Sequence, residues 1–131
     1  MEQQDVHLFV FEGLSDWEAG YAIAGINNPQ FQRHPGRYRV RTIALKKAPV
    51  STAGGVRIVP DLMLDALSAA DGAMLILPGG AAWDEGRHGE VVELARSFLD
   101  AGRPVAAICG ATAGLARGGA AGQQAAYEQC P

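Results

Sequence analysis

The sequence predicts an α/β fold in which a mostly parallel sheet lies between two layers of helices. Apolar runs of strand length alternate along the chain with segments of helical periodicity. The runs are largely apolar rather than alternating, as expected of strands buried on both faces, and several end in glycine-containing loops. The chain has 131 residues and no linker-like segment, so we expect a single domain.

The first strand and the first helix are predicted between residues 6 and 27. Residues 6–11 (VHLFVF) are rich in β-branched and aromatic side chains, which favour a buried strand. Ser15 matches a helix N-cap, and Glu18 three positions later completes a capping box. Apolar residues then follow at helical spacing, so we expect a helix over residues 15–27.

Three further elements are predicted in the middle of the chain. Residues 38–45 (YRVRTIAL) alternate apolar and polar side chains, the pattern of a half-exposed strand. Residues 50–59 enclose a glycine pair and are typical of a hairpin. Residues 62–69 are a candidate for a short helix.

The C-terminal half repeats the strand and helix alternation. Residues 73–77 (AMLIL) predict a fully apolar strand, and residues 90–101 predict an amphipathic helix. Residues 105–108 predict another apolar strand, which leads directly through Cys109 into a helix. Parallel strands joined by helices have their carboxyl ends at one edge of the sheet. Catalytic and ligand-binding residues usually lie at this edge.

Composition excludes several classes of protein. The net charge is only −3, and 11 Lys and Arg are scattered among 14 Asp and Glu, which argues against binding to nucleic acid or an anionic membrane surface. No apolar run has the length of a membrane span, and the N-terminus is polar and acidic rather than a basic signal region, so we expect a cytoplasmic protein. We expect no metal site, because none of the three histidines has a ligand partner at useful spacing. We assign no cofactor.

Cys109 is the strongest candidate for a reactive side chain. It lies between an apolar strand and a helix, where the helix N-terminus favours a negatively charged sulfur. Gly110 would let a substrate approach and would expose its own N–H. A small buried residue that serves packing alone is an equally open interpretation. Cys130 lies in a different context, so we expect no structural disulfide.

The remaining candidates each have a simpler explanation. The simplest interpretation of Gly79-Gly80 is a turn. If these glycines lie beside Cys109, however, they could donate a backbone N–H to an oxyanion. Glu18 reads as the second half of the capping box. His88 could approach the same edge, but a solvated position at a helix start is the simpler expectation.

Three motifs together resemble the ThiJ/PfpI family, the family of the parkinsonism-associated deglycase. They are a glycine and a glutamate at Gly13 and Glu18, the segment LPGG at residues 77–80, and AICG at residues 107–110. The resemblance covers nearly everything up to Arg117 and is nearest to a bacterial branch often labelled type 1 glutamine amidotransferase-like.

This resemblance implies a three-layer flavodoxin-like sandwich that is usually homodimeric. It further implies that Cys109 is the reactive cysteine and that Glu18 hydrogen-bonds it. The backbone amides of Gly80 and Gly110 would form the oxyanion site. The implied activity is that of a cysteine-nucleophile hydrolase or lyase.

The sequence departs from the family pattern after Arg117. Family members continue with Ala-Gly-Leu-Leu, a polar turn and a His-Thr pair whose histidine faces the cysteine, whereas residues 118–131 show neither this pattern nor an apolar face. One G inserted after the Arg117 codon, in a GC-rich gene spelling Arg-Ala-Gly-Leu-Leu-Asp-Ser-Arg-Arg-His-Thr-Ser-Asn-Ala, would produce residues 117–130 as they stand. We therefore expect an incomplete family domain over residues 1–117 and a frameshifted tail outside the family pattern, which makes Cys130 an accident of the frame.

Two functions remain open from the sequence. The first is a cysteine-dependent hydrolase or amidohydrolase acting on a small carbonyl, amide or peptide substrate. Because the family's histidine is absent from this chain, we expect it to be inactive. Because the family's following strand and helices are absent as well, we expect it to be poorly folded, with a free strand edge where the missing strand would pair. The second is a non-catalytic redox- or stress-responsive protein in which Cys109 is oxidised and Glu18 stabilises the product.

Overall fold

The computed structural model describes residues 2–119 and the backbone of residues 125–128. Strands and helices alternate through most of the described chain. The strands are β1 (Gln4–Phe9), β2 (Tyr38–Ala44), β3 (Val50–Ser51), β4 (Arg57–Ile58), β5 (Leu62–Met63), β6 (Met74–Leu77), β7 (Val105–Ile108) and β8 (Ala125–Glu128). The α-helices are α1 (Gly20–Asn27), α2 (Gly89–Asp100) and α3 (Gly110–Arg117), and short 3-10 helices are η1 (Pro29–Phe31), η2 (Leu64–Ala66), η3 (Ala69–Asp71) and η4 (Ala81–Trp83).

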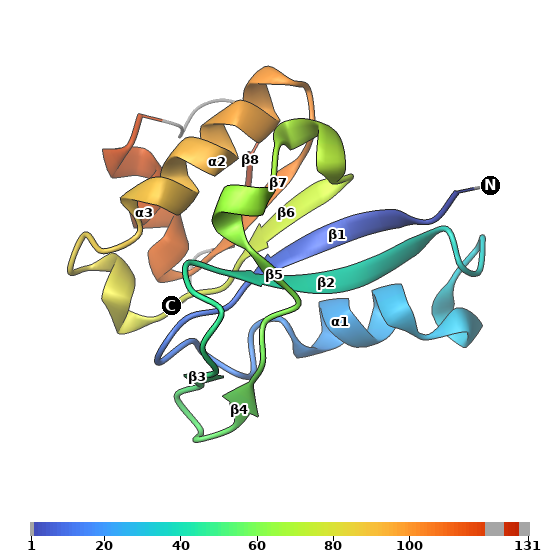
Figure 1. The fold of residues 1–131 in the computed structure, drawn as a ribbon, viewed down its shortest axis with the longest axis horizontal. Coiled ribbons are helices and arrows are strands. Elements are labelled where there is room, and N and C mark those ends of the chain that lie inside the picture. Colours follow the sequence, from blue (N-terminus) through green and yellow to red (C-terminus); the bar gives the residue numbers. More distant parts are fainter. Residues whose placement is uncertain (1, 120–124, 129–131) are drawn as a thin grey trace.

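Six strands form one sheet in the order β5-β2-β1-β6-β7-β8, and every neighbouring pair is parallel. Helix α1 lies on one face of the sheet, and α2 with α3 lies on the other (Figure 1). The short strands β3 and β4 form a separate antiparallel hairpin. This arrangement confirms the predicted three-layer α/β fold.

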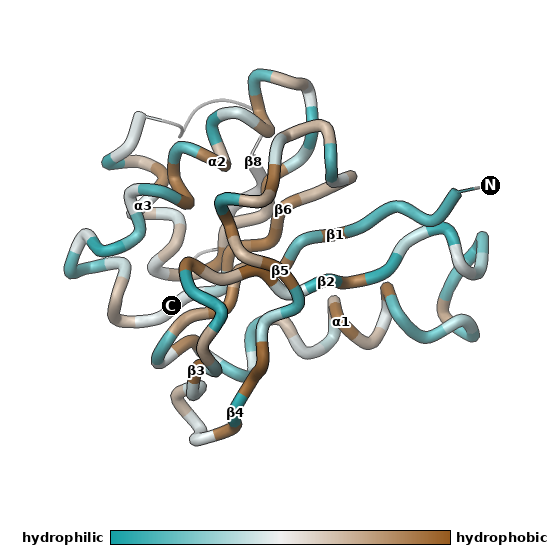
Figure 2. Tube along the Cα trace, in the orientation of Figure 1, coloured by the Kyte–Doolittle hydropathy of each residue, from teal (hydrophilic) through white to brown (hydrophobic). Residues whose placement is uncertain are grey.

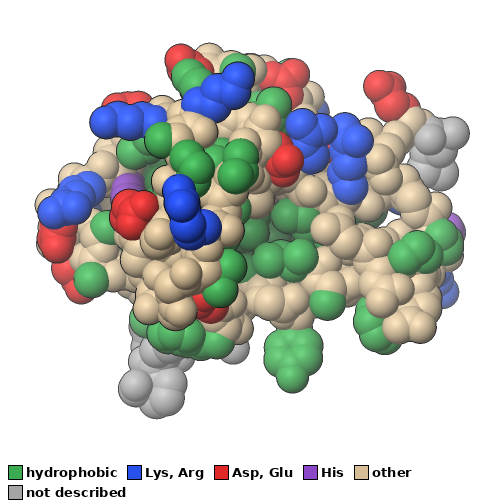
Figure 3. Space-filling model, turned by 60° about the horizontal axis from the view of Figure 1, so that its bottom comes forward, with side chains coloured by type: hydrophobic (Ala, Val, Ile, Leu, Met, Phe, Trp, Pro, Cys, Tyr) green, Lys and Arg blue, Asp and Glu red, His purple; other side chains and the backbone are tan. Residues whose placement is uncertain are grey.

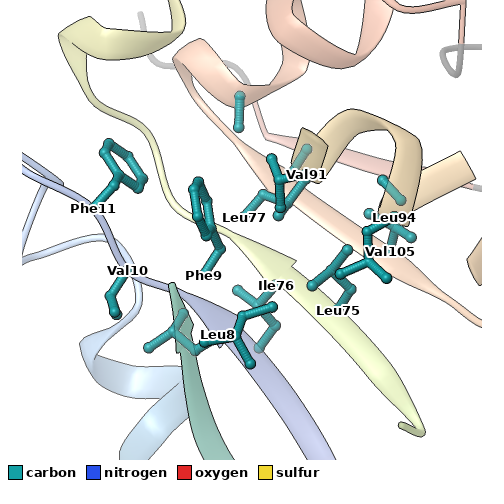
Figure 4. Packing of buried hydrophobic residues seen from close by; sticks show 14 of the residues in the cluster. Leu8, Phe9, Val10, Phe11, Leu75, Ile76, Leu77, Val91, Leu94 and Val105 are labelled. Atoms are coloured by element: carbon teal, nitrogen blue, oxygen red, sulfur yellow. The ribbon is translucent and has the colours of Figure 1, made fainter. Parts of the chain in front are cut away.

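The core fills both faces of the central strands. Figure 4 shows Phe9 and Leu77 on the side of α2, close to Val91, whereas Leu8 and Ile76 point to the opposite face. All five side chains are less than a tenth exposed. Successive residues of a strand point to opposite faces, which is why neighbours such as Leu8 and Phe9 both find a helix layer to cover them. Each large apolar side chain buried in this way stabilises the fold by about 1.5–3 kcal/mol.

The outer surface is mixed in character. Figure 2 shows hydrophilic residues at the start of β1, while the hydrophobic residues concentrate where the strands cross the middle of the molecule. Apolar side chains also reach the surface among Lys and Arg on the face drawn in Figure 3. Trp17 and Tyr21, just before and within α1, are 67% and 94% exposed. Within the described chain, no helix combines the length and apolarity that crossing a membrane would need.

The first helix starts later than the sequence predicts. Helix α1 begins at Gly20, and residue 19 takes the N-cap position without a side-chain hydrogen bond. Ser15 instead donates its backbone N–H to the carbonyl of Gly79 at 3.0 Å. The predicted capping box is therefore wrong, because contacts with a distant loop engage both of its residues.

Two short edge strands also differ from the sequence prediction. Residues 62–69 form strand β5 followed by η2 rather than one helix, because their first residues complete the edge of the sheet beside β2. Strand β8 lies in the segment expected to form no element, and it pairs with β7 from Val105 to Ile108. The predicted free edge of β7 is therefore wrong, since backbone pairing needs no apolar side chains. Cys130 lies outside the described residues.

Candidate active site

Cys109 occupies a sharp turn between β7 and α3. Its backbone has φ 52° and ψ −123°, and it is the one non-glycine residue with positive φ in the described chain. Such a conformation costs of the order of 1–3 kcal/mol and persists where the surrounding structure imposes it. The Thr112 hydroxyl and N–H both donate to the Cys109 carbonyl, at 2.6 and 3.0 Å. The turn holds the cysteine side chain half-buried at the carboxyl edge of the sheet.

The Glu18 carboxylate lies beside this turn. Its Oε2 accepts the N–H of Gly79 at 2.6 Å. A Cβ placed on Gly79 would lie 2.8 Å from the Cys109 Cβ and 2.8 Å from Glu18 Oε2. Glycine is therefore required at this position, because any side chain would displace the cysteine or the carboxylate. Glu18 and Cys109 thus lie on either side of this glycine. The hydrogen bond between them that the family resemblance implies is not among the hydrogen bonds of the described residues, and it stays a prediction.

Gly80 and Gly110 are also neighbours. A Cβ on Gly110 would lie 3.3 Å from the carbonyl oxygen of Gly80. Among the hydrogen bonds of the described chain, the N–H groups of these two glycines have no protein acceptor. The two amides predicted to hold an oxyanion are thus available on adjacent loops beside Cys109.

Trp83 connects these two loops, a role that was not predicted from the sequence. The indole N–H donates to the Pro78 carbonyl at 2.9 Å, and the backbone N–H donates to the Gly80 carbonyl at 3.2 Å. The indole ring also packs against α3 so closely that a Cβ on Gly114 would lie 2.3 Å from it. Trp83 is 2% exposed, and it therefore links the glycine loop to the helix that follows Cys109. In the sequence, the only indication of this role is that a tryptophan follows the Gly79-Gly80 pair by three residues.

His88 is not solvated, contrary to the expectation from the sequence. It is 5% exposed and packs against the rings of Phe9, Phe11 and Trp83, with centroids 4.6–5.0 Å apart. Neither ring nitrogen has a hydrogen-bond partner in the structure. Burial lowers the pKa of His88 below its ordinary value, and the charge of Arg87 lowers it further. Aromatic residues distant in sequence enclose this side chain, which the polar sequence around it does not reveal.

The β3–β4 hairpin supports the segment that carries Glu18. Asp16 accepts hydrogen bonds from the Thr52 hydroxyl and from the Gly54 N–H, and these bonds lower the pKa of Asp16. The Ala53 N–H donates to the Leu14 carbonyl at 2.8 Å. The loop between β1 and α1 is thereby held at both its backbone and its side chains.

Comparison with known proteins identifies the family. The DJ-1/PfpI family matches residues 4–126 of the sequence. This chain belongs to the DJ-1/PfpI family. Its mostly parallel sheet with helices on both faces is the flavodoxin-like α/β fold of DJ-1 superfamily structures. The assignment of residues 118–131 to a tail outside the family pattern stays a prediction.

Relatives of this DJ-1/PfpI chain are longer than the chain itself. It is 39% identical over 120 residues to the uncharacterized protease YoaZ of Bacillus subtilis, a match covering 91% of this chain and 57% of that protein. The ThiJ/PfpI family protein from Bacillus anthracis has a TM-score of 0.78 and 41% identity, covering 92% of this chain and 57% of that one. The DJ-1 superfamily protein Atu0886 from Agrobacterium tumefaciens has a TM-score of 0.77 and 26% identity, covering 89% and 59%. The chain thus spans less than two thirds of the length of each.

Proposed function

We propose that this DJ-1/PfpI protein is a cysteine-dependent hydrolase that acts on a small carbonyl, amide or peptide substrate. The observation that carries the proposal is the placement of Cys109 in a positive-φ turn, with the Glu18 carboxylate across Gly79. A nucleophile on such a turn is exposed to substrate and lies at the start of a helix, whose dipole favours a negatively charged sulfur.

The proposed reaction of an amide starts with attack of the Cys109 sulfur on the carbonyl carbon. The thiol proton passes to Oε1 of Glu18, because Oε2 already accepts the Gly79 N–H. Glu18 would thereby take the part expected of the family's histidine, so this proposal departs from the inactivity expected from the sequence. A C–S bond forms, and the carbonyl π pair moves to the oxygen, where the Gly80 and Gly110 N–H groups stabilise it. The C–N bond then breaks as Glu18 returns the proton to the leaving nitrogen. Water hydrolyses the thioester, breaks the C–S bond and restores the thiol.

The second candidate function is a redox response of Cys109 without turnover. Among the hydrogen bonds of the described chain, none joins a histidine to Cys109. A half-buried free thiol beside a carboxylate is the arrangement in which an oxidised sulfenic or sulfinic group could be hydrogen-bonded.

One pair of measurements separates the two functions. Amine release from small amides and p-nitroaniline release from peptide anilides are followed for the unchanged chain, Cys109→Ser, Glu18→Gln and Cys130→Ser. We expect turnover to be lost in Cys109→Ser, to fall about 10²–10⁴-fold in Glu18→Gln, and to persist in Cys130→Ser. Peptide mapping after peroxide treatment completes the test. Oxidation confined to Cys109, without turnover of any substrate, would establish the redox function instead.

A further inference from the structure

A pocket opens at the carboxyl ends of β1 and β2, next to the cysteine site and separate from it. Its volume is about 590 Å³, within the 300–1,000 Å³ that small-molecule pockets occupy. Its walls are mostly apolar and come from the ends of two strands, the loop before β3 and the loop after Gly80; they include Val10, Phe11, Leu45, Pro49, Val50 and Ala82. None of the residues proposed for the hydrolase reaction lines it.

Charged side chains at this pocket favour an anion. Lys46 and Arg87 line it together with Glu12. The Glu12 Oε1 already accepts the Ser51 N–H at 3.0 Å, which engages part of this carboxylate. Arg87 pairs with Glu85 at 2.5 Å, but both side chains are about half exposed or more, so this ion pair is weak and exchangeable. Lys46 forms no ion pair among the described residues. The pocket is thus lined by two cationic side chains and one carboxylate. This local excess of positive charge contrasts with the net charge of −3 of the whole chain.

His88 lines the same pocket as a buried neutral side chain. Its two ring nitrogens are without partners, although buried polar atoms in folded proteins are normally hydrogen-bonded. These nitrogens have almost no accessible surface, so an occupant would meet the ring and not its nitrogens. The pocket therefore combines an apolar body and a positive margin.

We propose that this pocket binds a small organic carboxylate with an apolar or aromatic body. The apolar walls would take the body of the molecule, and Lys46 and Arg87 would pair with its carboxylate. The site does not depend on the Cys109 chemistry. An occupant would touch Phe11, whose ring lies 2.7 Å from the Cβ position of Gly80, so the two sites share a wall.

The test uses 3-phenylpropionate and its uncharged amide, titrated by calorimetry at low and high salt into the full chain and into Cys109→Ser, in which the proposed hydrolase cannot cleave the amide. We expect the carboxylate to bind at least about tenfold more tightly than the amide, with an affinity that falls as salt rises. Lys46→Gln should weaken carboxylate binding about fivefold, the effect of losing one exposed ion pair. Lys47→Gln is the matched control, because Lys47 is adjacent and exposed but does not line the pocket.

Two more variants complete the test. Ala48 is exposed on the pocket wall, so Ala48→Phe should occupy the space and lower the affinity without unfolding the protein. Cys109→Ser should leave binding unchanged even if the hydrolase function proves wrong. Equal binding of acid and amide, equal effects of Lys46→Gln and Lys47→Gln, or no binding at all would overturn the proposal. Self-association that Ala48→Phe abolishes would also overturn it, because a second copy of the chain would then occupy the pocket.

Discussion

The Glu18 carboxylate accepts the backbone N–H of Gly79 at 2.6 Å, although the two residues lie 61 positions apart in the chain. This bond joins the segment after β1 to the loop after β6. It also places the carboxylate within reach of the turn that carries Cys109. A single glycine thus sets the relative position of the two side chains on which the proposed chemistry depends.

Gly79→Ala should disable the site more than it destabilises the fold. The added methyl group would lie 2.8 Å from both the Cys109 Cβ and Glu18 Oε2, so one of them must move. A displacement of a catalytic group by about 1 Å lowers the reaction rate by about 10²-fold. Alkylation of Cys109 by iodoacetamide and turnover measure the effect. Gly86→Ala is a control for glycine replacement outside the site, since nothing lies within 4 Å of its Cβ position, although its positive φ adds some strain. A Gly79→Ala protein with unchanged thiol reactivity and turnover would contradict this geometry.

Trp83→Phe should lower the free energy of unfolding by about 1–3 kcal/mol, because the buried carbonyl of Pro78 loses its donor. The phenyl ring keeps most of the apolar contact, so the fold should persist. Urea denaturation provides the measurement. Trp17→Phe is the matched control, because Trp17 is 67% exposed. Equal unfolding midpoints for the two variants would show that the indole hydrogen bond contributes little.

Gly114→Ala should destabilise the protein although alanine favours helices. Its Cβ would lie 2.3 Å from the Trp83 ring, and overpacking of this kind costs about 1–3 kcal/mol. Gly25→Ala in α1 has nothing within 4 Å of its Cβ and should stabilise the protein by about 0.4–1 kcal/mol. Thermal unfolding compares the two. Opposite shifts in Tm are expected, and two upward shifts would show that α3 is not held against Trp83.

Stability should fall as the pH drops below about 6.5, the ordinary pKa of histidine. Burial lowers the pKa of His7 and of His88 in the folded protein. Above 6.5 both are neutral in the folded and the unfolded chain; below it, the unfolded chain takes up protons that the folded protein excludes. The free energy of unfolding therefore decreases from pH 6.5 down to the lowered folded pKa values.

Urea unfolding between pH 5 and 8 measures this dependence. His88→Phe should make it shallower, because a phenyl ring fits among Phe9, Phe11 and Trp83 and takes up no proton. His34→Gln is the control, since His34 is exposed. An unchanged pH dependence in His88→Phe would assign the effect to His7 and other groups.

The sequence by itself determined the fold class and the position of the cysteine turn. Apolar runs at residues 73–77 and 105–108 can be buried only as central strands, and local spacing places Cys109 between strand and helix. The amphipathic pattern of residues 90–101 likewise predicts α2 almost to the residue. Each of these features depends on neighbours in the chain, which is why periodicity reveals them.

Only the tertiary structure decided what Glu18, Trp83 and His88 contact. The spacing of Ser15 and Glu18 fits a capping box, yet the carboxylate bonds to Gly79 because β1 and β6 are adjacent and end at the same edge. His88 is buried by rings from β1 and η4, so its polar neighbours in sequence say nothing about its surroundings. Strands β5 and β8 form through backbone pairing at the sheet edges, for which short segments carry little side-chain signal. Contacts of this kind depend on strand order, and strand order is set by the packing of the whole chain rather than by local sequence.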